Sequence, residues 1–455
     1  MAMMDRPANW VIGTDTQMVR ALLYAGLAIC DVLAVIVGFA MSDLIRHGGV
    51  KDMHSSSYWL IVPAFLAASF YVRAYSYSTL ISRHVSIWKA ISAMLAATAV
   101  TVLLLFALKN SGDVSRVAFF TGTVLGIAGL ILVRLPMPRL IKRLGSRFFR
   151  RVLITEGGCD ETVPAGYECI DVTRLGVRPD VADPLMLHRF SQIVAGADRV
   201  TVSCAVENRE RWSLYLKSVD CDGELLIPEL HNIEPLGSAG GIGLAGVRVS
   251  LGRMDMRNRL LKRGFDLAVA VTALILLSPV MLAVAIAIRL ESPGPVLFRQ
   301  QRMGRANRLF EVLKFRSMYV DQNDHAGDRS TARGDRRITR VGRIIRATSL
   351  DELPQLVNVV NGEMSLVGPR PHALGSKAGE NLFWHVDRRY WLRHTIKPGV
   401  TGLAQVRGHR GATDNEEDLV KRLESDMEYL ARWSIVNDIT ILVRTVLVLF
   451  HRNAY

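Results

Sequence analysis

Runs of apolar residues dominate the first third of the chain and recur once near its middle. Each of the four leading runs approaches the ~20 residues that a helix needs to cross a bilayer. The pattern therefore predicts membrane-spanning helices at about 18–41, 57–77, 86–108 and 117–137. A buried soluble helix bundle is the alternative, and the length of the runs disfavours it.

Basic residues set the expected orientation of these four helices. The segment after the fourth run is rich in cations, whereas the cations between the first two runs are balanced by acids. Because loops rich in Lys and Arg stay in the cytoplasm, both ends of the four-helix block are predicted to be cytoplasmic. The cations after the fourth run are Arg139, Lys142, Arg143, Arg147, Arg150 and Arg151.

A fifth apolar run, "LAVAVTALILLSPVMLAVAIAI", covers residues 267–288 and has Ser278-Pro279 at its centre. Proline removes a helix hydrogen bond and kinks the chain. Basic residues flank the run on both sides, so both flanks favour the cytoplasm. These features predict a re-entrant helix at about 265–290 that enters the membrane and returns, with Ser278 or neighbouring groups satisfying the freed carbonyls. A kinked full span is the alternative, and it would place everything after residue 290 outside the cell.

Residues 151–250 are less apolar and are expected to form a small Rossmann-like α/β domain. "RVLITEGG", "ADRVTVSC" and "LLIPEL" have the character of short buried strands, and a helical pattern covers 206–218. The sequence Gly241-Ile242-Gly243-Leu244-Ala245-Gly246 matches the dinucleotide fingerprint, but it precedes a strand-like segment rather than a helix. The domain is therefore expected to be degenerate and to bind no cofactor. The D-x-D at Asp220-Cys221-Asp222 is better explained as a polar turn than as a metal site for a nucleotide sugar.

Composition narrows the class of partner. Half of the 455 residues are hydrophobic and the formal net charge is +14, which together favour acidic lipid or a phosphate-rich substrate. No zinc-finger or RNA-reading motif is recognisable, so a nucleic-acid partner is not expected. The five cysteines are scattered without a CxxC pair, which argues against a disulfide framework or a zinc site.

The stretch "TSLDELPQL" at 348–356 places two carboxylates, Asp351 and Glu352, side by side. Ser349 and Glu352 fit a helix capping box, which is the structural explanation of the pair. Pro354 favours the first turn of a helix, so both carboxylates would lie at its positive end. That field and the nearby arginines are expected to keep both ionised near neutral pH.

Cations are collected around this pair. Lys314 and Arg316 alternate on one predicted strand, Arg346 precedes the carboxylates, and Arg370 follows them between two prolines. Arginine forks match phosphate geometry, so the set is typical of a site for a polyanion. Two carboxylates beside a phosphate require a bridging cation, for which Mg²⁺ is the usual choice. One carboxylate can then hold the metal while the other attacks phosphorus.

The motifs "KRGFD", the central Ser-Pro, "KFRSM", "TSLDELPQL", "GEMSLVGPRPH" and "KPGVTGLAQVRG" occur in this order over about 258–455. In this respect the chain resembles the bacterial sugar transferase family, the large monotopic phosphoglycosyl transferases that act on polyprenol phosphate. The resemblance implies a membrane protein of mixed α and α/β class with three parts: a transmembrane four-helix domain at 1–150, the degenerate domain at 151–250, and a catalytic domain at 251–455.

The resemblance also implies a ping-pong reaction at the cytoplasmic face of a bacterial inner membrane. Asp351 would attack a UDP-hexose and release UMP, and undecaprenyl phosphate would then take the phosphosugar. Glu352 would ligate Mg²⁺, Arg346 and Arg370 would hold phosphates, and Lys314 and Arg316 are weaker candidates for that role. The expected product is undecaprenyl-diphospho-hexose, made in the first membrane step of exopolysaccharide, capsule or O-antigen synthesis. Glucose is the first expectation for the hexose and galactose the second, and a homodimer is one possibility for the assembly.

Two other functions remain open on the sequence. One is a membrane-bound nucleotide-sugar dehydratase or epimerase, which needs an intact dinucleotide fingerprint and a Tyr-x-x-x-Lys motif in their proper context. The other is a non-catalytic membrane assembly protein, against which the retained carboxylates and cations argue.

Overall fold

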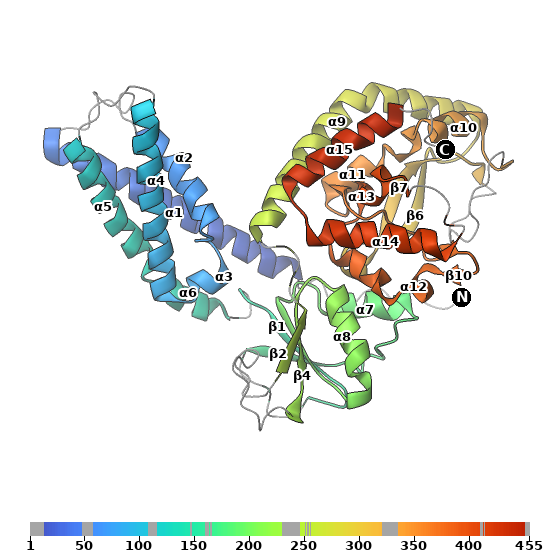
Figure 1. Cartoon of the computed structure of the whole chain (residues 1–455), viewed down its shortest axis with the longest axis horizontal. Coiled ribbons are helices and arrows are strands. Elements are labelled where there is room, and N and C mark those ends of the chain that lie inside the picture. The colour runs from blue at the N-terminus through green and yellow to red at the C-terminus, as the bar shows by residue number, and fades with distance from the viewer. Residues whose placement is uncertain are drawn as a thin grey trace. The chain divides into compact units, whose positions relative to one another are not determined.

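The chain folds into two compact units, Met1–Arg150 and Arg151–Tyr455, in a computed structural model (Figure 1). The residues that the structure describes are 13–47, 58–107, 116–145, 148–159, 163, 166–229, 246–250, 252, 254, 256–320, 335–409, 413 and 415–450. The sequence-based boundary near 150 coincides with the boundary between the units. Residues 151–250 and 251–455 lie together in the second unit, and their division into separate domains stays a prediction.

The first unit is helical, and three of its helices are long and apolar enough to cross a membrane: Met18–Ile45, Arg83–Ala107 and Arg116–Leu144. The second predicted span differs from expectation, because its described helix has only 14 residues and contains Pro63. A turn follows it at once, so this helix is shorter than a full crossing. The helices of this unit are α1 (Gly13–His47), α2 (Tyr58–Tyr71), α3 (Tyr77–Leu80), α4 (Arg83–Ala107), α5 (Arg116–Arg134) and α6 (Met137–Leu144).

One buried ion pair joins α1 to α5 inside this apolar unit. Arg134 lies 2.5 Å from Asp31, and neither side chain is exposed to solvent. Tyr75 donates a hydrogen bond to the same carboxylate, and Arg134 also donates to the carbonyl of Ala74. Charges away from water need such partners, so the pair fixes how the two helices face each other.

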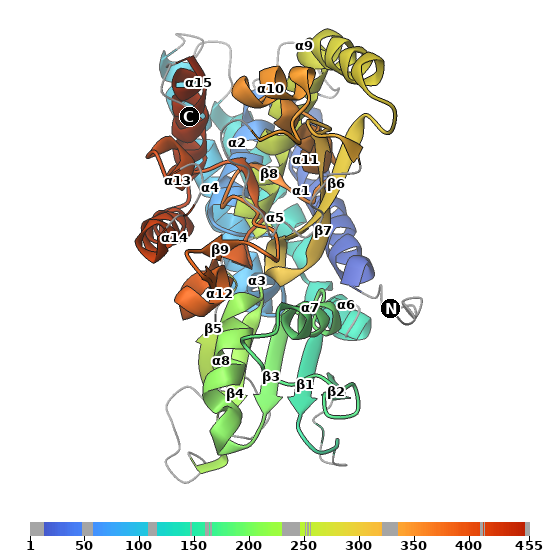
Figure 2. The same ribbon diagram turned by 90° about the vertical axis from the view of Figure 1, so that its right-hand side faces the viewer.

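The second unit begins with a five-stranded sheet in the order β2-β1-β3-β4-β5, which Figure 2 shows in succession. The first four strands are parallel and β5 runs antiparallel to β4. Buried valines and isoleucines of β1 and β3 face α7 and α8 in the core. The elements are β1 (Arg151–Thr155), β2 (Tyr167–Asp171), α7 (Pro184–Ile193), β3 (Arg199–Ser203), a 3-10 turn (Val206–Asn208), α8 (Arg209–Ser218), β4 (Asp222–Leu226) and β5 (Gly246–Ser250).

The expected α/β character of this region is confirmed, with one strand, β2, and one helix, α7, that the sequence did not predict. Of the dinucleotide fingerprint, Gly241 to Ala245 lie outside the described residues, and Gly246 opens strand β5. The expectation about cysteines is wrong for one pair: Cys159 and Cys169 form a disulfide between the segment after β1 and strand β2.

The rest of the second unit is built around one long helix, α9 (Met256–Glu291), and a β-hairpin that follows it. Two short parallel strands, β8 and β11, lie at the centre of a shell of helices. The elements after α9 are β6 (Leu297–Met303), a 3-10 turn (Arg305–Asn307), β7 (Leu309–Phe315), α10 (Arg340–Ala347), a 3-10 turn (Leu350–Glu352), α11 (Gln355–Asn361), β8 (Ser365–Val367), β9 (Lys377–Ala378), β10 (Asn381–Leu382), α12 (Phe383–Val386), a 3-10 helix (Arg388–Thr395), β11 (Gly399–Thr401), α13 (Leu403–Val406), α14 (Glu416–Ala431) and α15 (Ile435–Phe450).

Helix α9 is continuous through Pro279 and appears as one curved helix in Figure 1. Proline has no N–H, so the carbonyl four residues earlier, that of Ile275, loses its usual donor. The hydroxyl of Ser278 donates to this carbonyl at 2.8 Å. Ser278 therefore replaces the hydrogen bond that Pro279 removes, as the sequence predicted.

The sheet and the catalytic region share one hydrophobic core. Trp212 and Tyr215 of α8 belong to the same buried cluster as Trp384, Tyr390 and Trp391. This continuity explains why the two regions form one compact unit.

Polar contacts at the tip of the β6–β7 hairpin reinforce that core. Asp220 accepts a hydrogen bond from Arg259 at 3.1 Å and a very short one from Arg305. The D-x-D is thus a polar turn whose first carboxylate joins the sheet to the catalytic region.

Candidate active site

Asp351 and Glu352 lie in a single 3-10 turn between α10 and α11, which positions the pair. Ser349 before them adopts a left-handed conformation with φ of 57°, an uncommon backbone state for a residue other than glycine. Its side chain forms no capping hydrogen bond, so the capping box is not made. Helix α11 begins at Gln355 directly after Pro354, which leaves both carboxylates before the helix, as predicted.

Glu352 is held by two cations from distant elements. Its Oε1 accepts hydrogen bonds from Lys314 Nζ at 2.9 Å and from Arg370 Nη2 at 2.6 Å. Burial alone would raise the pKa of Glu352, but the charges and hydrogen bonds of Arg370 and Lys314 outweigh it and hold that pKa well below its usual range. Glu352 is therefore a fixed anion.

Asp351, its neighbour, accepts no hydrogen bond from any side chain or backbone group that the structure describes. Burial raises the pKa of this carboxyl, the charge of Glu352 adds to the rise, and Lys314, Arg346 and Arg370 oppose it. The cations thus lower the pKa of Glu352, as expected, whereas the pKa of Asp351 is raised, and the ionisation of both carboxylates near neutral pH stays a prediction. Desolvation outweighs the surrounding cations at Asp351 because none of them forms a hydrogen bond with it.

The predicted cations separate into two groups. Lys314, Arg346 and Arg370 all act electrostatically on Asp351. Arg316 lies elsewhere: its guanidinium donates to the carbonyls of Ser292 and Pro293, and it holds the segment that follows α9. Alternation along the strand placed Lys314 and Arg316 on the same side, but the described hydrogen bonds of Arg316 go to the carbonyls of Ser292 and Pro293 and to the hydroxyl of Ser292.

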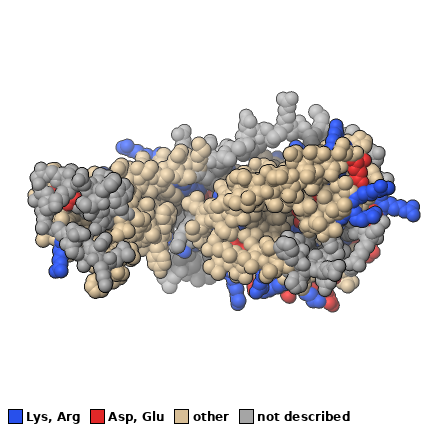
Figure 3. Space-filling model, turned by 90° about the horizontal axis from the view of Figure 1, so that it is seen from above, with Lys and Arg blue, Asp and Glu red and all other residues tan. Residues whose placement is uncertain are grey.

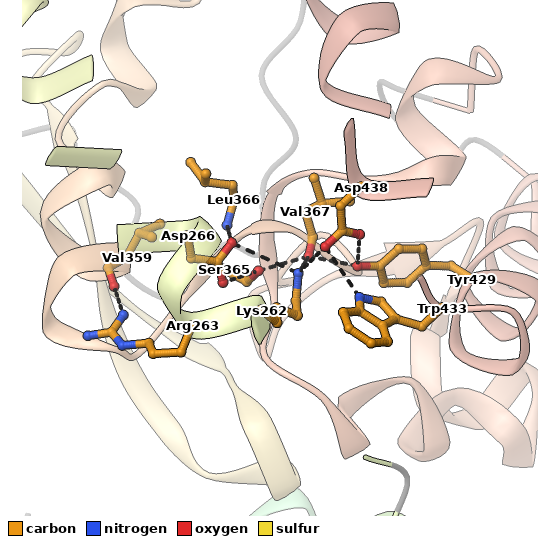
Figure 4. Close-up of polar contacts among 10 residues, drawn as sticks. All are labelled: Lys262, Arg263, Asp266, Val359, Ser365, Leu366, Val367, Tyr429, Trp433 and Asp438. Atoms are coloured by element: carbon orange, nitrogen blue, oxygen red, sulfur yellow. Dashed lines mark hydrogen bonds and ion pairs between the residues drawn. The ribbon is translucent and has the colours of Figure 1, made fainter. Parts of the chain in front are cut away.

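The motif "KRGFD" proves to anchor helix α9 (Figure 4). Lys262 donates to the carbonyl of Val367 at 3.0 Å and to Asp438 at 2.7 Å. Asp266, one turn later, accepts from Ser365 and from the backbone N–H of Leu366. Because strand β8 leads directly to Arg370, these bonds fix the base of α9 relative to a cation of the site.

Two further contacts in Figure 4 complete this anchor. Arg263 donates to the carbonyl of Val359 at the end of α11. Tyr429 donates to Asp438 at 2.7 Å, which ties α14 and α15 to the same network. Helix α11, which follows the carboxylate turn, strand β8 and the membrane-length helix α9 are thereby connected through buried polar contacts.

Sequence reasoning missed a second cluster of ionisable residues beside Arg370. Arg393 donates to Asp426 at 2.9 Å and to the carbonyl of Arg370 at 2.8 Å. His372 lies between Arg393 and Arg422, and burial together with these two charges holds its pKa well below the usual range. The motif "GPRPH" contained His372, but Arg393, Arg422 and Asp426 had no sequence signal beyond their charge.

The residues present can accommodate a hard divalent cation. Asp351 has carboxylate oxygens without a described hydrogen bond, and Glu352 Oε2 has only a long contact of 3.3 Å with Arg370. No cluster of three or more acidic, histidine or cysteine ligands occurs among the described residues. Such a pair suits Mg²⁺, which is commonly held by one or two carboxylates together with the phosphates of a substrate.

In the sheet region, the place where a doubly wound fold binds phosphate is filled by the chain itself. Glu156, directly after β1, accepts a hydrogen bond from the backbone N–H of Ala205 at 3.1 Å. It also accepts from Asn208 and, at 2.7 Å, from Trp212. Glu156 therefore takes donors at the ends of β1 and β3, where a doubly wound fold receives its ligand. That this domain binds no nucleotide stays a prediction.

The membrane-length helix α9 indicates a membrane protein, and the cations around Asp351 and Glu352 are suited to an anionic ligand. Residues 257–452 match the family model described as bacterial sugar transferase. A relative from Rhizobium leguminosarum bv. phaseoli, named exopolysaccharide production protein PSS, is 49% identical over 186 residues, which are 41% of this chain and 93% of the relative. The chain belongs to the bacterial sugar transferase family.

Two longer relatives are similar over the same region. The undecaprenyl-phosphate glucose phosphotransferase of Komagataeibacter xylinus is 51% identical over 195 residues, 43% of this chain and 37% of the relative. The UDP-glucose:undecaprenyl-phosphate glucose-1-phosphate transferase of Escherichia coli (strain K12) is 49% identical over 189 residues, 42% of this chain and 40% of the relative. The similarity thus spans well under half the length of these two relatives.

The opposite environments of the two carboxylates predict opposite effects on stability. At pH 7, Glu352→Gln should cost ~1.5–3 kcal/mol, because hydrogen bonds to charged groups contribute about that much. Asp351→Asn should raise the thermal midpoint, because folding raises the pKa of Asp351 and ionised Asp351 therefore opposes folding. As the pH falls below the ordinary pKa of a glutamate, the wild-type advantage over Glu352→Gln should decline, and it should be lost only when the pH falls through the lowered pKa of Glu352 in the folded protein.

Tryptophan fluorescence during heating would measure these midpoints in the purified full-length protein. Glu311→Gln is the matched control, since Glu311 is half exposed and its contact with Arg299 is 3.5 Å long. Equal losses in Asp351→Asn and Glu352→Gln would contradict the division between the two carboxylates.

Proposed function

We propose that this protein transfers hexose-1-phosphate from a UDP-hexose to undecaprenyl phosphate, giving UMP and undecaprenyl-diphospho-hexose. The observation that supports this most strongly is the contrast within the carboxylate pair. Glu352 is bound by two cations, whereas Asp351 has no described partner and a raised pKa. A carboxylate that is poorly solvated and unbonded is the better nucleophile.

In the first step, an Asp351 oxygen attacks the β-phosphorus of the UDP-hexose. A bond forms between that oxygen and phosphorus, and the bond from phosphorus to the bridging oxygen breaks. The electron pair leaves with the bridging oxygen, which becomes part of UMP. Lys314 and Arg370 offset the charge of the transferring phosphate while they hold Glu352 in place.

In the second step, a phosphate oxygen of undecaprenyl phosphate attacks the same phosphorus. The bond to Asp351 breaks, and the carboxylate is regenerated. Arg346, on the last turn of α10, provides a further positive charge near Asp351 for either phosphate substrate. Arg316, engaged with the carbonyls after α9, takes no part in this proposal.

We further propose that Glu352, whose Oε2 has only a long contact with Arg370, holds Mg²⁺ together with the substrate phosphates. The ion would neutralise phosphate charge and so favour attack by an anionic carboxylate.

Helix α9 supports a site at the membrane surface. Its first half is bound through Lys262 and Asp266 to strand β8, and Val284 and Ile288 of its second half pack with Phe315 and Ile345. Both ends of the helix therefore contact the same folded region. A straight crossing would carry the second end to the opposite membrane surface, so these contacts favour a re-entrant helix whose bend lies at Ser278-Pro279.

An exposed apolar stripe on α15 lies at helical spacing and extends this surface. Val436, Ile439, Val443, Val446 and Leu447 are all exposed. Figure 3 shows a broad surface formed by uncharged residues, with Lys and Arg at its right-hand end and along its lower edge. A helix of this kind lies in the bilayer interface with its apolar stripe among the acyl chains. Such a placement on the cytoplasmic face of a bacterial inner membrane would admit both a soluble nucleotide sugar and a lipid phosphate.

Glucose is the proposed hexose, because the relatives from Komagataeibacter xylinus and Escherichia coli are named for glucose. The product would then enter exopolysaccharide, capsule or O-antigen synthesis. A dehydratase or epimerase is disfavoured by Glu156, which occupies the donors that a dinucleotide phosphate would need. A non-catalytic assembly role would not require a buried Asp351 without a described hydrogen-bond partner.

The reaction predicts a covalent adduct on Asp351. Wild-type protein mixed with UDP-glucose and Mg²⁺ alone should gain the mass of one hexose phosphate and release UMP. Asp351→Asn should do neither, whereas Glu311→Gln should behave as wild type. Rapid quenching followed by intact-protein mass spectrometry measures the adduct, and a panel of UDP-sugars identifies the hexose. An adduct mapped to another residue, or a fully active Asp351→Asn protein, would refute the assignment.

The topology predicts that both ends of α9 face the cytoplasm. Cysteines at Gly264, where an added side chain meets nothing within 4 Å, and at the exposed Arg299 should both react with an impermeant maleimide only from the cytoplasmic side. The experiment uses inside-out and right-side-out vesicles and a background without the five native cysteines. Labelling of position 299 from the periplasmic side would eliminate the re-entrant helix. Pro279→Leu should straighten α9 and make position 299 periplasmic in part of the molecules.

A further inference from the structure

The side chain of Asn358 on α11 binds the backbone of strand β7. Its Nδ2 donates to the carbonyl of Glu311 at 2.7 Å, and its Oδ1 accepts from the backbone N–H of Leu313 at 3.0 Å. Strand β7 pairs with β6 in a two-stranded sheet, so among the described residues its other edge has no strand partner. Asn358 is only 1% exposed, and its amide satisfies backbone groups of β7 that a neighbouring strand would otherwise bind.

The amide of Asn358 suits this edge in one orientation. Its nitrogen faces a carbonyl and its oxygen faces an N–H, so a rotation by 180° would bring like groups together. Nδ2 also donates to the carboxylate of Glu363, just after α11, at 2.6 Å. The amide is therefore held from both sides, and it sets the position of β7 along α11.

Hydrophobic packing between the same two elements does not specify that position. Val312 of β7 belongs to one buried cluster with Leu356 and Val359 of α11. Contacts of this kind hold the elements together, but they are non-directional, so they resist a small slide of the strand only weakly. The two bonds from Asn358 to the backbone oppose that slide, because hydrogen bonds weaken steeply with distance and angle.

The position of β7 bears on the reaction because Lys314 directly follows Leu313. Lys314 Nζ lies 2.9 Å from Oε1 of Glu352, which is in the turn that precedes α11. Strand β7 is thus tied to this segment at two points, through Asn358 and through Lys314. Loss of the first tie would let the strand shift, and the second would lengthen.

We propose that Asn358 is a positioning residue for the transfer reaction, which fixes β7 against α11 and thereby holds the ammonium of Lys314 at Glu352. This inference rests on the proposed function and extends it to a residue outside the carboxylate turn. Displacement of a group in an active site by about 1 Å can cost about 10²-fold in rate, so a tie of this kind has a measurable effect.

The test follows adduct formation on Asp351 from UDP-glucose and Mg²⁺ at a series of pH values. The rate falls on the acid side as the attacking carboxylate is protonated. Burial and the charge of Glu352 raise the pKa of Asp351, and the charges of Lys314, Arg346 and Arg370 lower it. A displaced Lys314 would therefore raise the pKa of Asp351 and move the acid limb to higher pH.

Asn358→Ser removes the amide and leaves room for water beside β7. It should slow adduct formation at least ~10-fold and move the acid limb to higher pH, in the same direction as Lys314→Met. A mere loss of folded protein would lower the fraction of molecules that carry the adduct and leave the limb in place. Asn358→Gln gives a second test if the serine variant does not fold, because it keeps the amide but displaces it by one methylene, and it should move the limb in the same direction.

Asn307→Ser is the matched control. Asn307 is also a buried asparagine, lies at the tip of the same hairpin, and donates to the carbonyl of Ser218 at 2.9 Å. Its replacement should lower the thermal midpoint and leave the acid limb unchanged.

A double-mutant cycle with Lys314 provides the second readout. In the Lys314→Met background, Asn358→Ser should have little further effect on the rate, because the group that it positions is absent. Rate losses that multiply would overturn the proposal, and so would an acid limb that stays in place in both Asn358 variants.

Thermal unfolding separates this inference from the transfer reaction. Glu352→Gln should lower the midpoint less in the Asn358→Ser background than in wild type, because the bond between Lys314 and Glu352 is already weakened there. Such coupling in a protein that forms no adduct would retain the role of Asn358 in placing Lys314 and reject the transfer reaction. An adduct without this coupling and without a shift of the acid limb would do the reverse.

Discussion

The bond between Glu352 and its two cations organises the catalytic region. Lys314 comes from β7, Arg370 from the segment after β8, and Glu352 from the turn before α11, so one carboxylate joins three elements that are far apart in sequence. Because Glu352 takes both cations, Asp351 is left within their field but without a hydrogen bond. The different environments of these two adjacent acidic residues therefore follow from one ion-pair network.

A second network of buried polar contacts connects helix α9 to the segment that carries Arg370. Lys262 and Asp266 bind strand β8 from the base of α9, and the same strand leads to Arg370. Buried polar contacts of this kind stabilise one register of packing rather than several, since any shift would leave charges unpaired. The position of helix α9 and the position of Arg370 are thus set by the same few bonds.

Much of this organisation could be predicted from the sequence, and the failures have physical causes. Hydropathy and charge located the long helices and the Ser-Pro bend, because those depend on composition alone. Arg316 was grouped with Lys314 since both are basic and alternate on a strand, but only the fold shows that backbone carbonyls take its guanidinium. The disulfide between Cys159 and Cys169 was missed because their proximity arises from the pairing of β1 with β2 and not from their spacing. The pKa of Asp351 could not be inferred either, because desolvation depends on burial that charge patterns do not reveal.

The most direct test of the two-step account is isotope exchange in the absence of any lipid acceptor. Labelled UMP, unlabelled UDP-glucose and Mg²⁺ are incubated with the full-length protein, and the label that enters UDP-glucose is measured. A covalent Asp351 intermediate predicts exchange in wild type and none in Asp351→Asn. Exchange that requires undecaprenyl phosphate would mean that both substrates must bind before transfer, and it would contradict the role given to Asp351.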